Sequence, residues 1–280
     1  LAELRKRYGM ARAHLVVAQG ELRKKAARKF GDWADRLIWN EKLLEQATDR
    51  DIAEYKAKRF PAGGKLLDLC CGAGGDYFAL AERGAATGYD RSPAAALLAE
   101  VNAKRLGREA KVVCGDAQDA PLEEAEAWHI DPDRRSGSER TSQLAFASPD
   151  AATLRRMLES NPHAAIKTAP ADRKCELASE GMELEWIGSR GECRQLVLWS
   201  GKLARHPGKR TATVVEHPDF TVVGEAHAPI EYAERIGTFL HEPHNAMLGA
   251  ELENALAASI GATRVDPMAA YFTSETSSPH

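Results

Sequence analysis

The sequence has 280 residues, of which 44% are hydrophobic and 28% are charged, a composition typical of a folded globular protein. No apolar run approaches the ~20 residues that span a bilayer, and the first residues lack the apolar core of a signal peptide. The five cysteines form no C-x-x-C pair, which argues against a disulfide framework and against a structural zinc site. We therefore expect a cytoplasmic protein with reduced thiols, no metal and no membrane association.

Charge is unevenly distributed along the chain. The formal net charge is −3, yet residues 1–29 hold nine Lys and Arg against only Glu3 and Glu21. A local excess of this size attracts phosphate groups at short range. From charge alone, a solvated helix face is the simpler explanation. The basic residues are Arg5, Lys6, Arg7, Arg12, Arg23, Lys24, Lys25, Arg28 and Lys29.

Residues 1–60 are predicted to be helical. Apolar residues recur at helical spacing in Leu15, Val16, Ala18 and Leu22, and again in Leu37, Ile38, Leu43, Leu44 and Ala47. Thr48 followed by Asp49 is typical of a cap that opens a helix running toward Phe60. The sequence Pro-Ala-Gly-Gly at 61–64 then interrupts the pattern, which indicates a domain boundary.

Short apolar runs alternate with helical stretches beyond this boundary. Strands are predicted at Lys65–Cys71, Ala86–Asp90, Lys111–Gly115, Ala127–Asp131 and His163–Thr168. Helices are predicted between them at Tyr77–Arg83, Ala94–Leu106 and Ala151–Ser160. Strands separated by helices of this length predict βαβ units and a parallel sheet.

The remaining segments are too closely spaced for helical crossovers. Met182–Ser189 and Cys193–Trp199 are predicted to form an antiparallel hairpin. Further strands are predicted at Thr211–Val215, Phe220–Val223 and Ile236–Leu240, followed by a helix over Asn245–Ile260. The predicted organisation is a helical extension (1–60), a central domain (61–205) and a small α+β unit (206–280).

A glycine-rich turn joins the first predicted strand to its helix. The sequence over residues 68–76 is Asp-Leu-Cys-Cys-Gly-Ala-Gly-Gly-Asp. Such a turn lets the backbone approach a ligand near a helix N-terminus. Dinucleotide-binding proteins require G-x-G-x-x-G, but Tyr77 stands at the third glycine, so a dinucleotide fits poorly.

The turn instead resembles the first motif of class I methyltransferases, an acidic residue followed by alternating glycines. Asp68, Gly72 and Gly74 match that motif, while Cys70 stands where it usually has its first glycine. The resemblance implies that this segment binds S-adenosyl-L-methionine.

Two more aspartates follow successive strands, where open α/β sheets bind ligands. Asp90 ends the second strand and is placed to accept hydrogen bonds from ribose hydroxyls, in a dinucleotide or in S-adenosylmethionine. Asp116 follows the third strand and matches the methyltransferase residue that contacts the adenine amino group. The resemblance therefore implies one cofactor site, made of Asp68, Cys70, Gly72, Gly74, Asp90 and Asp116.

The fourth strand ends in a loop where methyltransferases of amino groups have D/N-P-P-aromatic. Asp131 and Pro132 match that motif, whereas Asp133 replaces the second proline and Arg134 the aromatic residue. We expect Asp131 to orient the methyl acceptor, together with Pro132 and Arg134. Arg134 and Arg135 could instead clamp a phosphate or carboxylate of the substrate.

Two neighbouring positions have simpler interpretations. His129 is expected to be a packed core histidine rather than a base, because it alternates with Asp131 along the strand. Lys167 ends the fifth strand and faces the same edge, where it is a further candidate for substrate contact.

The order of motifs is also similar to a bacterial methyltransferase group with a THUMP-like C-terminal region. The matching segments are 44–48, 70–76, 131–135, 165–170, 191–193 and Glu242-Pro243. The resemblance covers most of the chain and implies an RNA substrate, because true THUMP domains bind RNA.

The sequence thus predicts an α/β fold with a Rossmann-like, mainly parallel sheet of seven strands, a helical N-terminal extension and a small α+β C-terminal unit. The predicted function is methyl transfer from S-adenosylmethionine to RNA, and tRNA is one candidate. Two alternatives stay open: a methyltransferase of a small molecule or protein, and a non-catalytic RNA-binding module that retains the cofactor fold. The sequence does not define the oligomeric state.

Overall fold

The computed structural model describes residues 2–133, 135–136, 139–140, 147–217 and 220–277. They fall into two compact units, Leu1–Trp128 and His129–His280, and the division lies inside strand β4 (Ala127–Ile130). Among the described residues, no helix is both long enough and apolar enough to cross a membrane. The predicted boundaries after residues 60 and 205 remain predictions.

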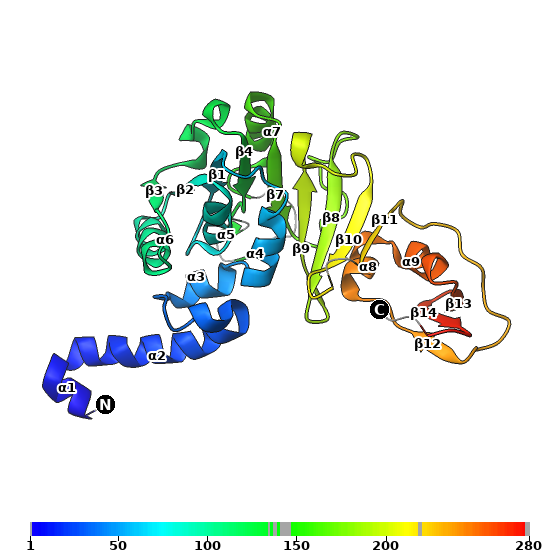
Figure 1. The fold of residues 1–280 in the computed structure, drawn as a ribbon, viewed down its shortest axis with the longest axis horizontal. Helices are drawn as coiled ribbons and strands as arrows, with labels where there is room; N and C mark the ends of the chain where they lie inside the picture. The colour runs from blue at the N-terminus through cyan, green and yellow to red at the C-terminus, as the bar shows by residue number, and fades with distance from the viewer. Residues whose placement is uncertain (1, 134, 137–138, 141–146, 218–219, 278–280) are drawn as a thin grey trace. The chain divides into compact units, whose positions relative to one another are not determined.

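The first unit begins with helices, as the sequence predicts. They are α1 (Ala2–Tyr8), α2 (Met10–Phe30), the short 3-10 helix η1 (Gly31–Trp33), α3 (Glu41–Gln46) and α4 (Arg50–Ala57). The second half of α2 packs on the unit through Phe30, whose ring centroid lies 4.6 Å from that of Trp39. Figure 1 shows α1 and the start of α2 extending away from the rest of this unit. The apolar face predicted around Leu15 and Val16 is accordingly exposed, at 66% and 51%.

Three βα repeats follow in the first unit, close to their predicted positions. The elements are β1 (Lys65–Leu69), α5 (Gly75–Arg83), β2 (Ala85–Asp90), α6 (Pro93–Arg105), β3 (Lys111–Cys114) and the 3-10 helices η2 (Ala117–Asp119) and η3 (Leu122–Glu124). Strand β2 pairs in parallel with both β1 and β3. The carboxyl ends of these strands therefore lie at one edge of the sheet.

The second unit continues with one helix and five strands of the large sheet. They are α7 (Ala151–Ser160), β7 (Ala164–Thr168), β8 (Glu183–Ser189), β9 (Glu192–Trp199), β10 (Arg210–Val214) and β11 (Thr221–Gly224), with a 3-10 helix η5 (Gly201–Leu203). A separate short pair comprises β5 (Arg135–Ser136) and β6 (Glu139–Arg140). The predicted β8–β9 hairpin is confirmed. Its turn residues Arg190 and Gly191 have φ of 52° and 77°, which suits a tight hairpin turn.

The large sheet has the hydrogen-bonded order β11-β10-β8-β9-β7-β4-β1-β2-β3. It contains nine strands among the described residues, two more than the seven expected. Strand β10 pairs in parallel with β8, and β11 pairs antiparallel with β10, so two strands assigned to the C-terminal unit extend this sheet. The spacing pattern predicted the strands but not their partners, because pairing is decided by tertiary packing.

The chain ends in a small antiparallel sheet with two helices. The elements are β12 (Phe239–His241), α8 (Asn245–Ala250), α9 (Glu253–Ser259), β13 (Thr263–Asp266) and β14 (Ala269–Ser274), in the sheet order β12-β14-β13. The sequence prediction missed β13 and β14. It was also wrong to expect one helix over Asn245–Ile260, because Glu251 adopts a left-handed conformation with φ of 59° and ends α8.

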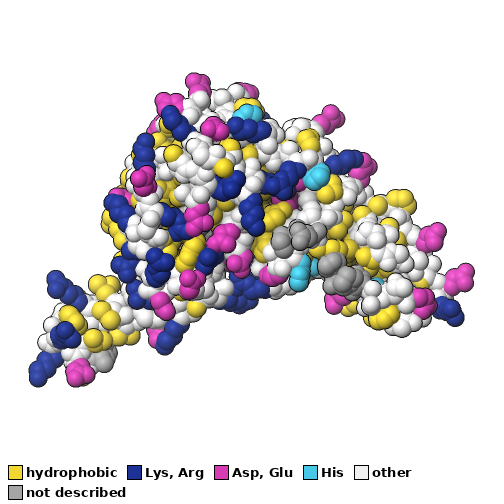
Figure 2. Space-filling view, in the orientation of Figure 1, with side chains coloured by type: hydrophobic (Ala, Val, Ile, Leu, Met, Phe, Trp, Pro, Cys, Tyr) yellow, Lys and Arg dark blue, Asp and Glu magenta, His cyan; other side chains and the backbone are white. Residues whose placement is uncertain are grey.

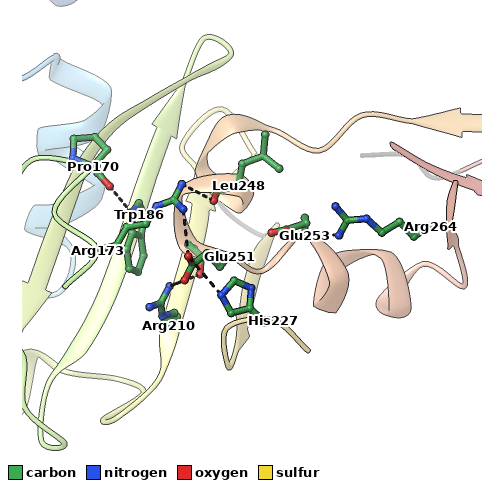
Figure 3. A network of polar contacts seen from close by, with 10 residues as sticks. Pro170, Arg173, Trp186, Arg210, His227, Leu248, Glu251, Glu253 and Arg264 are labelled. Carbon is green, nitrogen blue, oxygen red and sulfur yellow. Dashed lines mark hydrogen bonds and ion pairs between the residues drawn. The ribbon is translucent and has the colours of Figure 1, made fainter. Parts of the chain in front are cut away.

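The helix break at Glu251 is held by three basic side chains, as Figure 3 shows. Arg210 donates Nη1 to Oε2, while Arg173 Nη1 and His227 Nε2 lie 3.2 Å and 3.6 Å from Oε1. Arg173 also donates to the carbonyl of Leu248 at 3.2 Å. A left-handed conformation costs a non-glycine residue about 1–2 kcal/mol, which these contacts offset. They tie α8 to β10 and to the segment that follows β7.

Candidate functional site

The glycine turn between β1 and α5 is an open stretch of backbone. Gly72 and Gly74 have φ of 56° and 98°, a region that glycine enters without steric cost. A side chain built on Gly72 would meet no described atom within 4 Å, so this backbone has room for a ligand. A Cβ on Gly74 would lie 2.4 Å from the Phe78 ring, so packing against α5 also requires glycine there.

The Asp90 carboxylate fastens this turn to the end of β2. Its Oδ2 accepts the backbone N–H of Gly72 at 2.9 Å, and its Oδ1 accepts that of Ser92 at 2.8 Å. An ionised carboxylate offers about four lone-pair positions, so capacity remains for two further donors. The residue predicted to accept ribose hydroxyls is therefore also the one that orders the glycine turn.

Asp68 flanks the same turn from within β1, where it is buried. Burial raises the pKa of the nearby Cys71 thiol well above its ordinary value. The negative charges of Asp68 and Asp90 raise it further. Both carboxylates therefore act electrostatically on the Cys71 side chain.

Asp116 lies beyond β3 and is exposed. Its Oδ1 accepts the N–H of Gln118 at 2.9 Å, which caps the short helix η2. Cys114, two residues earlier, is the register partner of Asp90 in the β2–β3 pair. Five of the predicted residues thus lie in the glycine turn or at the ends of the two strands beside it, while Asp116 lies two residues beyond the register partner of Asp90.

A buried polar network that no sequence pattern indicates lies next to the turn. Asp76, in the first turn of α5, forms an ion pair with Lys56 at 2.7 Å and accepts the Thr48 hydroxyl at 2.6 Å. In its sequence context, Thr48 is predicted to be part of a helix cap. Asp76 could have been singled out, because a carboxylate directly after a glycine turn needs a partner if it is buried. Its partners come from segments that no local pattern connects to it.

In the second unit, Asp131 follows β4 and forms an ion pair through Oδ2 with the ammonium of Lys167 on β7. Pro132 is buried, and so is His129, as the core interpretation predicts. Arg134 lies outside the described residues. The two sequence candidates for substrate contact, Asp131 and Lys167, are thus partners of each other.

A comparison with protein families matches residues 66–130 to a methyltransferase domain. The chain is 29% identical, over 99% of its length, to an uncharacterized S-adenosylmethionine-dependent methyltransferase of Mycobacterium tuberculosis, found in strains CDC 1551 and H37Rv. The alignment covers 78% of that protein. These matches identify the protein as an enzyme, an S-adenosylmethionine-dependent methyltransferase.

A solved structure supports the same fold. The crystal structure of a putative methyltransferase from Porphyromonas gingivalis W83 superposes with a TM-score of 0.78 at 24% identity. The superposition covers 95% of this chain and 71% of the other. The shared architecture therefore includes most of the chain, beyond the segment 66–130 that matches the domain family.

The features of the glycine turn fit S-adenosylmethionine. The open backbone at Gly72 leaves space, and the Asp90 carboxylate keeps capacity for hydroxyl donors. The family match runs from β1 to the end of β4, so it contains all six predicted cofactor residues. Asp131 and Lys167 lie outside the matched segment.

Cys70 is the position where this methyltransferase departs from the glycine motif, and its backbone is strained. Its φ of 59° is a conformation in which a Cβ costs about 1–2 kcal/mol. We predict that Cys70→Gly stabilises the protein by about 0.5–1 kcal/mol, because strain relief exceeds the added entropy of the unfolded chain. Urea denaturation measures the difference. Cys70→Ala is the matched control: it removes the thiol, keeps the Cβ and should bring no gain. If both variants stabilised the protein equally, backbone strain caused by the Cβ of Cys70 would be ruled out as the reason.

Proposed function

We propose that this methyltransferase acts on RNA, with α1 and α2 as its RNA-binding surface. Residues 1–29 carry seven more positive than negative charges, although the whole chain is slightly acidic. Figure 2 shows dark-blue basic side chains beside yellow apolar ones on α1 and the start of α2. This exposed positive surface is the observation that carries the proposal.

The contacts of the basic residues on α2 indicate which of them serve the fold and which can bind phosphate. Arg23 donates to the carbonyl of Leu37, and Lys29 donates to three carbonyls at the end of α3, so both serve the fold. Lys24 and Lys25 have side chains that are 76% and 62% exposed. Their ion pairs with Glu21 and Glu41 are exposed and therefore weak, which leaves both ammonium groups able to exchange to phosphate. Lys24 and Lys25 are the proposed phosphate contacts on α2.

At the cofactor site, we propose that Asp90 binds the ribose, Asp116 the adenine, and Asp68, Cys70, Gly72 and Gly74 shape the pocket. S-adenosylmethionine supplies a methyl group that is already activated on a sulfonium. The protein therefore needs to align the acceptor, exclude water and accept a proton where the nucleophile carries one.

We assign acceptor orientation to Asp131, with Pro132 shaping its loop. Lys167 holds Oδ2 of the carboxylate, and this contact fixes the rotamer of Asp131. The assignment of Arg134 to substrate binding is part of the same proposal.

Two finer attributes complete the proposal. We relate the C-terminal unit, with its three-stranded antiparallel sheet and helices α8 and α9, to the THUMP-like group. We also assign the protein to the cytoplasm, where thiols stay reduced, because all five of its cysteines are free.

The cofactor assignment predicts that Asp90→Ala weakens S-adenosylhomocysteine binding by roughly 10- to 100-fold. Each hydrogen bond to a charged group contributes about 1.5–3 kcal/mol. Isothermal titration calorimetry measures the change. Asp119→Ala, an aspartate of η2 without a proposed cofactor contact, is the control and should bind normally. Comparable binding of NAD by the wild-type protein would overturn the assignment.

The Asp131 assignment predicts that Asp131→Ala lowers kcat at least about 100-fold, since misplacing the acceptor costs that much. S-adenosylhomocysteine affinity should stay within threefold of wild type. Asp131→Asn should keep a measurable rate, because an amide still orients an acceptor. Transfer of labelled methyl groups to separate RNA, protein and metabolite fractions provides the assay. Full turnover by Asp131→Ala would remove this residue from the mechanism.

The RNA assignment predicts that affinity for single-stranded RNA falls with salt, with a logarithmic slope of about −0.7 per phosphate neutralised. The double variant Lys24→Glu/Lys25→Glu should flatten that slope by about 1.4, as two contacts are lost. Lys104→Glu is the matched control, because Lys104 also forms an exposed ion pair on a helix of the first unit. Methyl label in the protein or metabolite fraction alone, or salt-insensitive RNA binding, would favour the alternative substrate classes.

A further inference from the structure

The glycine turn is supported from behind by a buried ion pair. The Lys56 side chain on α4 is only 2% exposed, and its Nζ lies 2.7 Å from Oδ1 of Asp76. The Thr48 hydroxyl donates to Oδ2 of the same carboxylate at 2.6 Å. Both oxygens of Asp76 are thus held by residues of the N-terminal helical extension.

The segment that carries Thr48 lies directly against the turn. A Cβ on Gly75 would lie 2.9 Å from the backbone oxygen of Thr48, a distance that real Cβ atoms do not adopt. Helix α4 packs beside α5, as Figure 1 shows. Gly75 is therefore required by this close approach rather than by its own backbone conformation.

Lys29 in turn secures the segment before Thr48. Its Nζ donates to the carbonyls of Leu44, Glu45 and Ala47 at 3.0, 2.9 and 2.8 Å. These carbonyls lie at the end of α3, where helical hydrogen bonding stops. The position of Thr48 is thereby linked to α2 by three hydrogen bonds.

We propose that Thr48 and Lys56 are positioning residues for the cofactor, which act by fixing Asp76 and with it the glycine turn. Asp76 follows Gly74 by two residues, so a shift of its carboxylate moves the backbone that Asp90 holds from the other side. The proposal rests on the cofactor site assigned above. It gives the helical extension a role in methyl-donor binding.

The energetic cost of burying charges indicates that the Lys56–Asp76 pair fixes the position of Asp76 rather than adding stability to the fold. Removing two charges from water costs several kcal/mol per ion, and a buried ion pair is often no more stable than apolar residues of the same volume. A buried pair does, however, fix geometry, because each charge must meet its partner at a defined place. The first turn of α5 adds a favourable dipole for the Asp76 carboxylate.

The test compares two threonines with the same chemistry. Thr48→Val removes the hydroxyl that reaches Asp76. Thr211→Val removes a buried hydroxyl that donates to Glu183 at 3.0 Å in the second unit. Both variants should lower Tm by similar amounts. Only Thr48→Val should raise the Kd of S-adenosylhomocysteine, by about fivefold, which is less than the full value of a hydrogen bond to a charged group because Thr48 acts on the ligand through Asp76. Thr48→Ser restores the hydroxyl and should restore affinity.

A second variant replaces the whole polar cluster. Thr48→Val/Lys56→Met/Asp76→Leu substitutes apolar side chains for all three groups, so none of the three is left without the partner described above, and the protein is expected to stay folded. We expect a Tm near or above that of wild type and a Kd for S-adenosylhomocysteine raised at least fivefold. A purely structural network would not give this result, in which the affinity for S-adenosylhomocysteine falls while the Tm is maintained.

The possible results distinguish failure of the positioning role from failure of the cofactor site on which it rests. A wild-type protein that binds S-adenosylhomocysteine, with Thr48→Val and the triple variant binding equally well, overturns the positioning role alone. Failure of the wild-type protein to bind, or normal binding by Asp90→Ala, overturns the site assignment and the inference with it.

Discussion

The hydrogen bonds accepted by Asp90 connect the parts of the first unit that surround the glycine turn. One carboxylate accepts the N–H of Gly72 in the turn after β1 and the N–H of Ser92, which in turn caps α6. The open turn, the end of β2 and the start of α6 therefore share one anchor. The two oxygens of the Asp90 carboxylate have about four lone-pair positions and use two for these N–H groups, so they can still accept hydroxyl groups of a nucleoside. Local order in the turn therefore depends on the side chain that we propose binds the ribose.

The sequence was most informative where function and local geometry coincide. Glycines with positive φ, and aspartates at strand ends, are dictated by short-range chemistry, so the turn at Gly72 and Gly74 and the place of Asp90 at the end of β2 could be predicted without a structure. Their role in cofactor binding stays a prediction. The βα repeats were also predicted closely, because each helix and strand has its own periodicity. The β8–β9 hairpin was predictable because too few residues separate its strands for any other connection.

Sequence reasoning failed where the deciding partner is distant. Thr48 resembles a helix cap in its local context, and only the fold brings it to Asp76. Glu251 lies in a helix-forming stretch, yet Arg173 and Arg210 hold it in a left-handed turn. Leu15 and Val16 have the spacing of a buried face but are exposed, because α2 continues beyond the part of the unit that covers it. In each case the deciding factor is the presence or absence of a tertiary contact, which a local pattern does not contain.

The pairing of β10 with β8 determines where the chain can be truncated without exposing a strand of the large sheet. A protein ending at residue 205 would lose β10 and β11, and the N–H and C=O groups of β8 that face β10 would be left unpaired. An exposed strand of this kind is a template for pairing with other chains. Buried residues such as Trp186 would also lose their cover, because Arg210 lies over its ring. Truncation after the hairpin would therefore yield a protein prone to self-association, whereas ending after β11 would retain the complete sheet.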